Sequence, residues 1–233
     1  MKPVLSLVIP LYNEEGNILP LAESAAAVLA ALGQPHEIIL VDDGSTDGTA
    51  AEIAAAAARW PAVRALPLRP NRGQAEALLA GLRTAEGDFL AMMDGDGQND
   101  PRDLPALLAL VEGGGVDLAC GWRTDRHDTR LRRLMSRVAN AVRGRLLRDG
   151  VHDSGCQLRV MRREVLAALR PMELMQSFVP ALAAGAGFRV GERPVRHRAR
   201  TRGESKYGLG RLWLRPALAM LGLWWRQRRS PRR

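Results

Sequence analysis

Residues 90–100 read LAMMDGDGQND, a short apolar run followed by a cluster of aspartate, glycine and amide residues. An apolar run of this length predicts a buried strand, and the polar cluster predicts the loop that follows it. Carboxylates this close together repel one another, and burying them costs desolvation energy. Asp94, Asp96 and Asp100 therefore need either open solvent or a positively charged partner.

The same succession of strand and polar loop occurs twice earlier in the chain. "LSLVIP" (5–10) runs into "PLYNEE" (10–15), and "EIILVDD" (37–43) runs into "VDDGSTDGT" (41–49). Strands that alternate with helices of 10–15 residues predict a mostly parallel sheet covered by helices on both faces. Because such sheets bind ligands at their carboxyl edge, we expect the three polar clusters on one rim. Strands are expected at 5–10, 37–43, 63–68, 88–94 and 116–122, and helices at 16–32, 47–60, 73–85, 102–112, 129–148, 163–169 and 174–184.

Composition favours one sizeable domain in a reducing compartment. The chain has 233 residues, of which 46% are hydrophobic, and its two cysteines, Cys120 and Cys156, cannot form a disulfide framework. We expect both to be buried free thiols. The N-terminal "VLSLVIP" is too short for a signal peptide, and no apolar run reaches the roughly 18 residues of a membrane span. The catalytic machinery is therefore expected on the cytoplasmic side.

Positive charge is concentrated at one end of the chain. The net charge is +9, and residues 196–233 hold twelve of the 34 Lys and Arg residues but a single acid, Glu204. The rest of the chain is thus close to neutral, and only 4% of all residues are aromatic. This distribution argues against a protein built throughout to coat nucleic acid. The first strand is not followed by G-x-G-x-x-G, and a Walker A loop is absent, which disfavours ordinary dinucleotide-binding and P-loop readings.

Three interpretations of residues 94–100 are open from the residues themselves. The first is a solvated turn after a strand, which is common. The second, an EF-hand loop, fails because Asn99 occupies the glycine position and Pro105 that of the closing glutamate. The third is a Mg²⁺ or Mn²⁺ site that holds substrate phosphates, with oxygen ligands from Asp94, Asp96 and Gln98.

Five ordered motifs support the third interpretation. "VIPLYNEEGNI", "IILVDDGSTDGT", "NRGQAEALLAGL", "FLAMMDGDGQNDP" and "RGESKYG" together resemble family 2 glycosyltransferases of the GT-A fold. The resemblance runs from about residue 4 to 210, and it is greatest to the dolichyl-phosphate mannosyltransferase-like branch and its bacterial polyprenyl-phosphate relatives. It implies an α/β fold, with a mostly parallel sheet sandwiched by helices. The residues of the tail add a basic amphipathic C-terminal helix, so the expected domains are a catalytic domain at 1–208 and a basic, Trp-rich membrane-interface segment at 209–233.

The resemblance also assigns residues to the nucleotide sugar and the metal. Tyr12 packs on the base or ribose, Glu14 accepts hydrogen bonds from ribose hydroxyls, and Asp43 reads the base. Asp94 and Asp96 form the D-x-D pair with Gln98 as a third ligand of Mg²⁺ or Mn²⁺, while Asp94 has the donor sugar or ribose as an alternative partner. Asp100 is expected to cap the helix that Pro101 opens, as Asp47 caps the helix at 47–60. The expected nucleotide-pocket residues are Pro10, Tyr12, Glu14, Val41, Asp43, Asp94, Gly95 and Asp96.

Catalysis and the acceptor are expected to involve Asp96 and three basic residues. Arg123 faces the diphosphate or the acceptor, and Arg200 and Lys206 flank a loop that closes over both. Such cations stabilise a leaving diphosphate. Asp153 resembles an aspartate near the acceptor site, and the neighbouring His152 is a weak candidate for a general base, because a phosphate acceptor is already anionic.

The function implied is that of an inverting, metal-dependent hexosyltransferase. It would move a hexose from a UDP- or GDP-sugar to a polyprenyl phosphate, at the cytoplasmic membrane face as a peripheral protein. The alternatives are a family 2 transferase with a polysaccharide or other hydroxyl acceptor and, with less support, a basic nucleic-acid-binding protein. Tryptophans beside arginines at 209–233 favour the membrane interface, with a C-terminal helix packed on the core as the alternative. Attachment through a membrane-protein partner or a homo-oligomer stays open.

Overall fold

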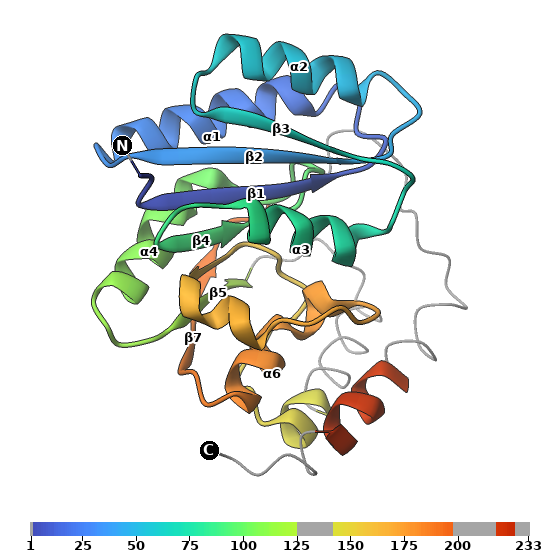
Figure 1. Ribbon diagram of the computed structural model, residues 1–233. Coiled ribbons are helices and arrows are strands. Elements are labelled where there is room, and N and C mark those ends of the chain that lie inside the picture. Colours follow the sequence, from blue (N-terminus) through green and yellow to red (C-terminus); the bar gives the residue numbers. More distant parts are fainter. Residues whose placement is uncertain (1, 125–141, 198–217, 227–233) are drawn as a thin grey trace.

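The computed structural model describes residues 2–124, 142–197 and 218–226. These residues form a seven-stranded mixed sheet in the order β3-β2-β1-β4-β6-β5-β7, with helices on both faces (Figure 1). The strands are β1 (Leu5–Leu11), β2 (His36–Asp43), β3 (Val63–Leu68), β4 (Phe89–Met92), β5 (Leu118–Arg123), β6 (Arg159–Arg162) and β7 (Val190–Val195). The labelled helices are α1 (Ile18–Ala31), α2 (Thr49–Arg59), α3 (Gln74–Thr84), α4 (Leu104–Glu112) and α6 (Met175–Gly185), with 3-10 turns at Pro101–Asp103 and Arg163–Ala168. Residues 142–147 and 218–226 are also helical.

Two apolar cores lie on opposite faces of the sheet. Along β1, Leu7 and Ile9 pack with α1, α2 and α4, whereas Val8 belongs to the cluster that contains α3 and α6. This alternation follows from the two-residue period of a strand. All seven residues of β1 are buried, as expected for a central strand covered on both faces. The predicted α/β sandwich is therefore confirmed.

The register of the central strands places their carboxyl ends at one edge of the sheet, which is the rim expected from the sequence. β1 runs parallel to β2, with Leu11 opposite Asp42, and parallel to β4, with Val8 opposite Met92. The carboxyl ends of the three strands therefore meet at one edge of the sheet. The loops that begin at Tyr12, Gly44 and Met93 all leave the sheet at this edge.

One strand runs against the others. The sequence pattern treats "QLRVMR" (157–162) only as a lead into the next helix, but its last four residues form β6, which lies antiparallel between β4 and β5. Because of this direction, the first residue of β6, Arg159, lies opposite Met92 at the carboxyl end of β4. Arg159 therefore lies at the rim, on a strand that the sequence pattern did not predict.

Local helix predictions are mostly confirmed. Asp100 caps the turn that Pro101 opens, and its side chain accepts from Arg102 N–H. The helix expected at 163–169 is instead a 3-10 turn over 163–168. α2 begins at Thr49 with Gly48 as its cap, and Asp47 accepts from Thr49 N–H at 3.0 Å one position earlier than a standard cap. Of the helix expected at 129–148, residues 142–147 are helical and 125–141 lie outside the described residues.

The described part of the C-terminal segment packs on the domain. Residues 218–226 are helical, and Leu223 is buried in the same core cluster as α3 and α6. Leu218, Leu221 and Trp225 remain exposed on this helix. The basic amphipathic helix expected for the whole of 209–233 stays a prediction, because the other residues of that range lie outside the described ones. Within the described chain, the helices are too short or too polar to cross a bilayer.

The close packing of α3 on the sheet can be tested at Gly81. An added Cβ there would lie 2.4 Å from Val8 Cγ1 and 2.7 Å from Val41 Cγ2. Both valines are fully buried and stiff at χ1, so they have no room to move away. We expect Gly81→Ala to lower the free energy of unfolding by about 1–2 kcal/mol in urea denaturation, even though Ala favours a helix.

The matched control for Gly81→Ala is Gly144→Ala. Gly144 is also helical, but an added Cβ would meet no atom within 4 Å. This control should leave stability unchanged or slightly raised. Equal losses in the two variants would contradict the packing argument.

Candidate functional site

The loop after β1 is fastened to the loop after β2. Asn13 N–H donates to Ser45 Oγ at 3.0 Å, and Asn13 Oδ1 accepts from Thr46 N–H at 2.8 Å. Glu14 N–H donates to Thr49 Oγ1 at 2.8 Å. Asn13 adopts a left-handed backbone conformation, with φ of 51°, which asparagine tolerates better than most residues. These bonds hold the two loops as one unit along the rim.

Tyr12 and Glu14 are placed at this rim as the sequence predicted. Tyr12 is 37% exposed at the rim, and an aromatic ring in such a position offers a surface on which a planar group such as a base can pack. The Glu14 carboxylate accepts from Asn17 Nδ2 at 2.9 Å. Its negative charge also contributes to a raised pKa of Asp94, so Glu14 lies within electrostatic range of the aspartate cluster.

Asp43 is buried, and it organises the neighbouring backbone. Its Oδ1 accepts from Arg72 N–H and its Oδ2 from Gly73 N–H, both at 2.8 Å. Gly73 is the N-cap of α3, so this carboxylate connects the end of β2 to the beginning of α3. The predicted role of Asp43 in reading a base stays a prediction, but both carboxylate oxygens already accept hydrogen bonds inside the protein.

Val41, which was expected in the nucleotide pocket, lies in the apolar core. Its side chain is fully buried in the core between β2 and α3, and an added Cβ at Gly81 would lie 2.7 Å from it. Such a side chain offers no surface to a ligand. The side chain of Val41 therefore belongs to the core, and the predicted contact of this residue with a nucleotide stays a prediction.

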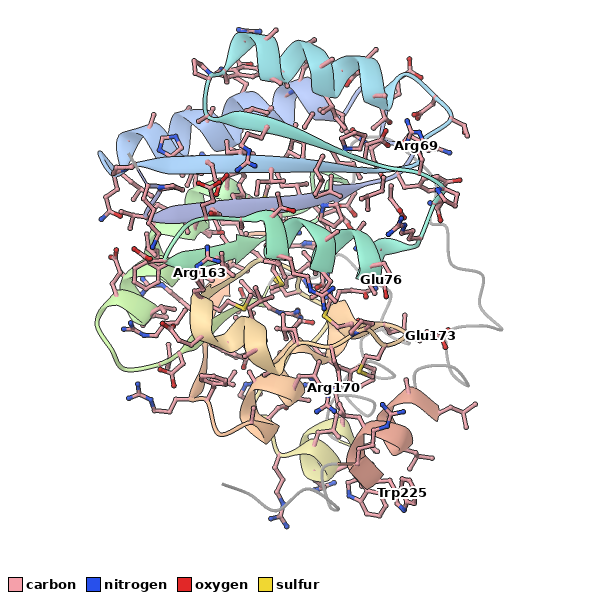
Figure 2. The ribbon with its side chains drawn as sticks, viewed as in Figure 1. Arg69, Glu76, Arg163, Arg170, Glu173 and Trp225 are labelled. Carbon is pink, nitrogen blue, oxygen red and sulfur yellow. The ribbon has the colours of Figure 1, made fainter. Side chains whose placement is uncertain are left out.

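The neighbouring Asp42 is also held by structure. Arg69 Nη1 and Nη2 both donate to Asp42 Oδ2 at 3.1 Å, and Asp42 Oδ1 accepts from Ser45 N–H at 2.9 Å. Figure 2 labels Arg69 at the carboxyl end of the strands. This agrees with a structural role for Asp42.

Asp94 and Asp96 lie just after β4, where repulsion and burial act on them together. Burial raises the pKa of Asp94 to about 7, with a further contribution from the charge of Asp96, whereas the charges of Arg159 and Arg123 act in the opposite direction. Asp94 Oδ1 accepts from Gln74 Nε2 at 2.8 Å, and Asp96 Oδ1 accepts from Gln98 N–H at 3.1 Å. The site therefore holds two neighbouring carboxylates whose ionised forms oppose each other.

This donor set fits a hard divalent cation. Burial is the larger cause of the raised pKa of Asp94 and the charge of Asp96 the smaller one, and a cation between the carboxylates would favour the ionised form against both. The described residues contain no group of three or more His, Cys, Asp or Glu side chains suited to a metal. Two carboxylates are nonetheless what Mg²⁺ commonly takes from a protein when substrate phosphates complete its coordination. The predicted side-chain ligation by Gln98 stays a prediction, since the structure shows its backbone N–H on Asp96.

Gly95 and Pro10 fit closely around this loop. An added Cβ at Gly95 would lie 2.1 Å from Leu11 Cδ2 and 3.5 Å from the Pro10 carbonyl oxygen. The loop thus passes too near β1 for a larger residue without a shift of Leu11. Pro10 and Asp94 also lie around a small gap in the packing that has no room for a water molecule.

Arg123 reaches the rim at the end of β5 but is already paired. Its Nε and Nη2 donate to the two oxygens of Asp153 at 2.7 and 2.9 Å. Burial alone would lower the pKa of Arg123, but the hydrogen bonds and charge of Asp153 outweigh it and raise the pKa, so the guanidinium is permanently charged. An added Cβ at Gly155 would lie 2.7 Å from Arg123 Nη2. Arg123 is thus held in a fixed bidentate pair, and contact with a diphosphate stays a prediction.

His152 is oriented by an acid on β7. Its Nδ1 lies 2.7 Å from Glu192 Oε2, and its ring stacks on Trp122 with centroids 5.0 Å apart. Glu192 also accepts from the backbone N–H groups of His152 and Asp153. This acid therefore fixes the loop that carries Asp153.

Four rim residues were not identified as site residues from the sequence. Gln74 contacts Asp94 directly, while Arg159, Gln157 and Gln176 lie behind it. Gln74 belongs to the "NRGQ" motif, and that motif was the sequence feature that could have identified it as a site residue. The other three stand in apolar or mixed segments, where no pattern distinguishes them. By contrast, the expected Arg200 and Lys206 lie outside the described residues.

The cysteines are buried and free, as predicted. Burial raises the pKa of the Cys120 thiol to about 12 and that of Cys156 to about 11. Neither thiol is thereby suited to act as a nucleophile near neutral pH.

Comparison with known proteins gives consistent matches. Residues 6–170 match the model of glycosyl transferase family 2. The chain is 42% identical over 211 residues to dodecaprenyl-phosphate galacturonate synthase of Rhizobium johnstonii, an alignment that covers 89% of this chain and 62% of the relative. It is 39% identical over 210 residues to undecaprenyl-phosphate 4-deoxy-4-formamido-L-arabinose transferase of Edwardsiella ictaluri, covering 89% of this chain and 64% of that protein. The chain thus spans less than two thirds of the length of these relatives.

Solved structures show the same fold. The mannosyltransferase PcManGT of Pyrobaculum calidifontis, in complex with GDP-Man and Mn²⁺, aligns with a TM-score of 0.68 at 22% identity, covering 100% of this chain and 66% of that one. Glucosyl-3-phosphoglycerate synthase of Mycobacterium tuberculosis, in complex with Mn²⁺, UDP and phosphoglyceric acid, aligns with a TM-score of 0.70 at 20% identity, covering 98% and 80%. At this identity the likeness shows the fold alone, and that fold is the GT-A type expected from the motifs.

The structural role of Asp43 yields a prediction about stability. In Asp43→Asn, the side-chain NH₂ would face one of the two backbone N–H groups that the carboxylate now accepts from. A buried donor left unpaired costs about 1–3 kcal/mol. We expect a loss of that size in the free energy of unfolding, measured by urea denaturation.

The control for Asp43→Asn is Asp88→Asn. Asp88 is exposed and pairs only at the surface with Lys2, so this substitution should change stability by less than about 1 kcal/mol. If Asp43→Asn were as stable as the parent protein, the carboxylate would not be organising the backbone of the loop.

Proposed function

The chain belongs to glycosyl transferase family 2, and on that premise we propose that it is an inverting, metal-dependent hexosyltransferase. Its donor would be a UDP- or GDP-sugar and its acceptor a polyprenyl phosphate. The observation that carries the proposal is the pair of rim carboxylates, Asp94 and Asp96, whose mutual repulsion suits a cation-bound diphosphate. The relatives named as polyprenyl-phosphate sugar transferases support the acceptor class.

The metal site would use the oxygen atoms of Asp94 and Asp96, with Gln98 as the third ligand. Solved relatives in complex with Mn²⁺ or Mg²⁺ support this choice of ion. A bound divalent cation would supply positive charge to the diphosphate that leaves. Tyr12 would cover the base, and Glu14 would accept hydrogen bonds from the ribose hydroxyls.

The transfer itself needs little proton chemistry. A phosphate oxygen of the acceptor would form a bond to the anomeric carbon as the bond from that carbon to the diphosphate oxygen breaks. The acceptor phosphate is already anionic near neutral pH, so it needs no general base to become a nucleophile. Arg123 would bring positive charge towards the two phosphate groups, and Arg200 and Lys206 would close over them from the loop that carries both.

A hydroxyl acceptor is the second candidate, and the hydrogen bonding of the described acids disfavours it. Such a reaction requires a carboxylate base. Asp153 is engaged by Arg123, and Glu192 is engaged by His152 and two backbone N–H groups. Neither carboxylate is therefore placed as an available base.

Association with the membrane surface is the second part of the proposal. Leu218, Leu221 and Trp225 recur at helical spacing and are exposed, at 66%, 49% and 52% respectively. The opposite side of the same helix is buried through Leu223. Trp225 lies at the periphery of the molecule (Figure 2), and aromatic rings of this kind favour the boundary between lipid and water. We therefore propose peripheral binding through this helix.

The metal site can be tested with Asp96→Ala. We expect transfer of hexose from a UDP- or GDP-sugar to undecaprenyl phosphate to fall by roughly two orders of magnitude or more, since charge stabilisation of the leaving group is lost. EDTA should have the same effect on the parent protein, and added Mn²⁺ should reverse it. The measurement is product formation by thin-layer chromatography for each nucleotide sugar.

Asp88→Asn is the control for this experiment too, because its carboxylate is exposed at the opposite end of the strands. It should keep full activity, and the melting temperature of Asp96→Ala should match that of the parent. Undiminished transfer in metal-free buffer would overturn the metal assignment.

The membrane surface can be tested with the double variant Leu221→Gln/Trp225→Gln. Each exposed apolar side chain contributes roughly 1.5–3 kcal/mol when it leaves water. We therefore expect a loss of at least about tenfold in binding to anionic vesicles, measured by flotation, while nucleotide binding stays unchanged.

The matched control changes one Leu and one Trp on the other side of the molecule, Leu19→Gln/Trp60→Gln. Both residues pack at the edge of the core that contains α1 and α2. This control should float with vesicles as the parent does. If both double variants float equally well, helix 218–226 serves only to pack on the domain.

A further inference from the structure

A directional chain of side-chain amides leads to Asp94 from inside the protein. Gln74 Nε2 donates to Asp94 Oδ1 at 2.8 Å, and Gln176 Nε2 donates to Gln74 Oε1 at 3.1 Å. Each amide has distinct donor and acceptor ends. The bond from Gln176 therefore fixes which end of Gln74 faces the carboxylate, so that the NH₂ group, and not the oxygen, points at Asp94.

The inner end of the chain is anchored by a buried arginine. Arg159 is 0% exposed, and its Nη1 donates to the backbone carbonyl of Gln176 and to Gln157 Oε1. Its Nη2 donates to the Ser154 carbonyl at 2.9 Å. These hydrogen bonds join β6 and the loop before it to the first turn of α6. Arg159 thereby holds the backbone of Gln176, while the side chain of Gln176 is held at its Nε2 end by the bond to Gln74.

The chain connects elements that are far apart in sequence. Gln74 is the first residue of α3, Gln176 lies in the first turn of α6, and Asp94 follows β4. Gln176 is buried, and its Nε2 reaches across the contact between α3 and α6. Polar side chains are seldom placed in such a contact unless their hydrogen bonds are needed.

An amide on one oxygen of a carboxylate fixes the rotation of that group about its Cβ–Cγ bond. Partners of this kind, one shell behind the ligands of a metal, orient those ligands and are needed for full metal affinity. A carboxylate that rotates freely must lose that freedom when it binds an ion. Residues that orient Asp94 beforehand therefore strengthen binding without touching the ion.

We propose that Gln74 and Gln176 are positioning residues for Asp94, with Arg159 as the buried anchor of the chain. The proposal rests on the proposed function, in which Asp94 is a metal ligand. Gln74 acts directly on the carboxylate. Gln176 acts one step further away, by holding the Gln74 amide in the orientation that donates.

The test compares Gln74→Met and Gln176→Met, which keep the length of the side chain and remove its hydrogen bonds. The readout is Mn²⁺ binding in the presence of UDP or GDP, followed through the electron paramagnetic resonance signal of free Mn²⁺. We expect affinity to fall by about 10–100-fold in Gln74→Met, as is typical of a lost partner behind a metal ligand, and by a smaller factor in Gln176→Met. The double variant should bind as Gln74→Met does, because Gln176 acts only through Gln74.

Gln34→Met is the matched control, since Gln34 lies at the opposite, amino end of the strands, before β2. It should bind Mn²⁺ as the parent protein does. Melting temperatures of all variants separate positioning from packing. If Gln74→Met and Gln176→Met melt at lower temperature but bind Mn²⁺ with parental affinity, the residues only pack α3 against α6 and the proposal is overturned.

The double variant gives a second decisive outcome. If the two substitutions lower the Mn²⁺ affinity by factors that multiply in the double variant, Gln176 does not act through Gln74. That result would also overturn the proposal. A parent protein that binds no Mn²⁺ with either nucleotide would instead overturn the metal site of the proposed function, and the positioning proposal would fall with it. The behaviour of the parent therefore distinguishes the two failures.

Discussion

The placement of two like charges at the end of β4 is the constraint on which the site depends. Burial, and to a smaller extent the charge of Asp96, raise the pKa of Asp94, so it is costly to ionise both carboxylates in this loop. The surrounding structure compensates for part of this cost with the Gln74 amide and with the charges of Arg159 and Arg123. The remaining need is for positive charge, which a divalent cation would supply. Under the proposed function, this repulsion would favour the binding of a cation, and the stability of the surrounding fold maintains it.

The groups that offset the charges of Asp94 and Asp96 are held in place by two other carboxylates at the rim, those of Asp43 and Asp153. Asp43 fixes the first turn of α3 through the backbone of Arg72 and Gly73, and α3 in turn begins with Gln74. On the other side, Asp153 holds Arg123 in a bidentate pair. The aspartates at the rim therefore have two different roles. Asp43 and Asp153 hold neighbouring groups in place through hydrogen bonds, whereas Asp94 and Asp96 repel each other. The division follows from their hydrogen-bond partners and not from their residue type.

The antiparallel direction of β6 is the less expected feature of the fold. Had β6 run parallel to its neighbours, Arg159 at its start would lie at the amino end of the sheet, far from Asp94. Because it runs the other way, Arg159 lies opposite Met92, the last residue of β4, and opposite Cys120 in the middle of β5. The loop before β6 carries Asp153, and its direction also brings that residue to Arg123. The antiparallel direction of β6 therefore places two charged groups, those of Arg159 and Asp153, around the site.

The sequence by itself determined the alternation of strands and helices, the gathering of three polar loops on one rim, and the D-x-D pair. These follow from local periodicity, from capping residues such as Asp100 and from the rule that parallel strands end on one edge. The tertiary structure alone decided that Val41 is a core residue, that Arg123 is paired with Asp153, and that a chain of glutamines supports Asp94. Gln74 and Gln176 are 102 positions apart, and no local pattern reports that separation. Gln74 and Gln176 come into contact only when α3 and α6 pack on the same face of the sheet. The distance between them is therefore set by the folded chain and not by their separation in the sequence.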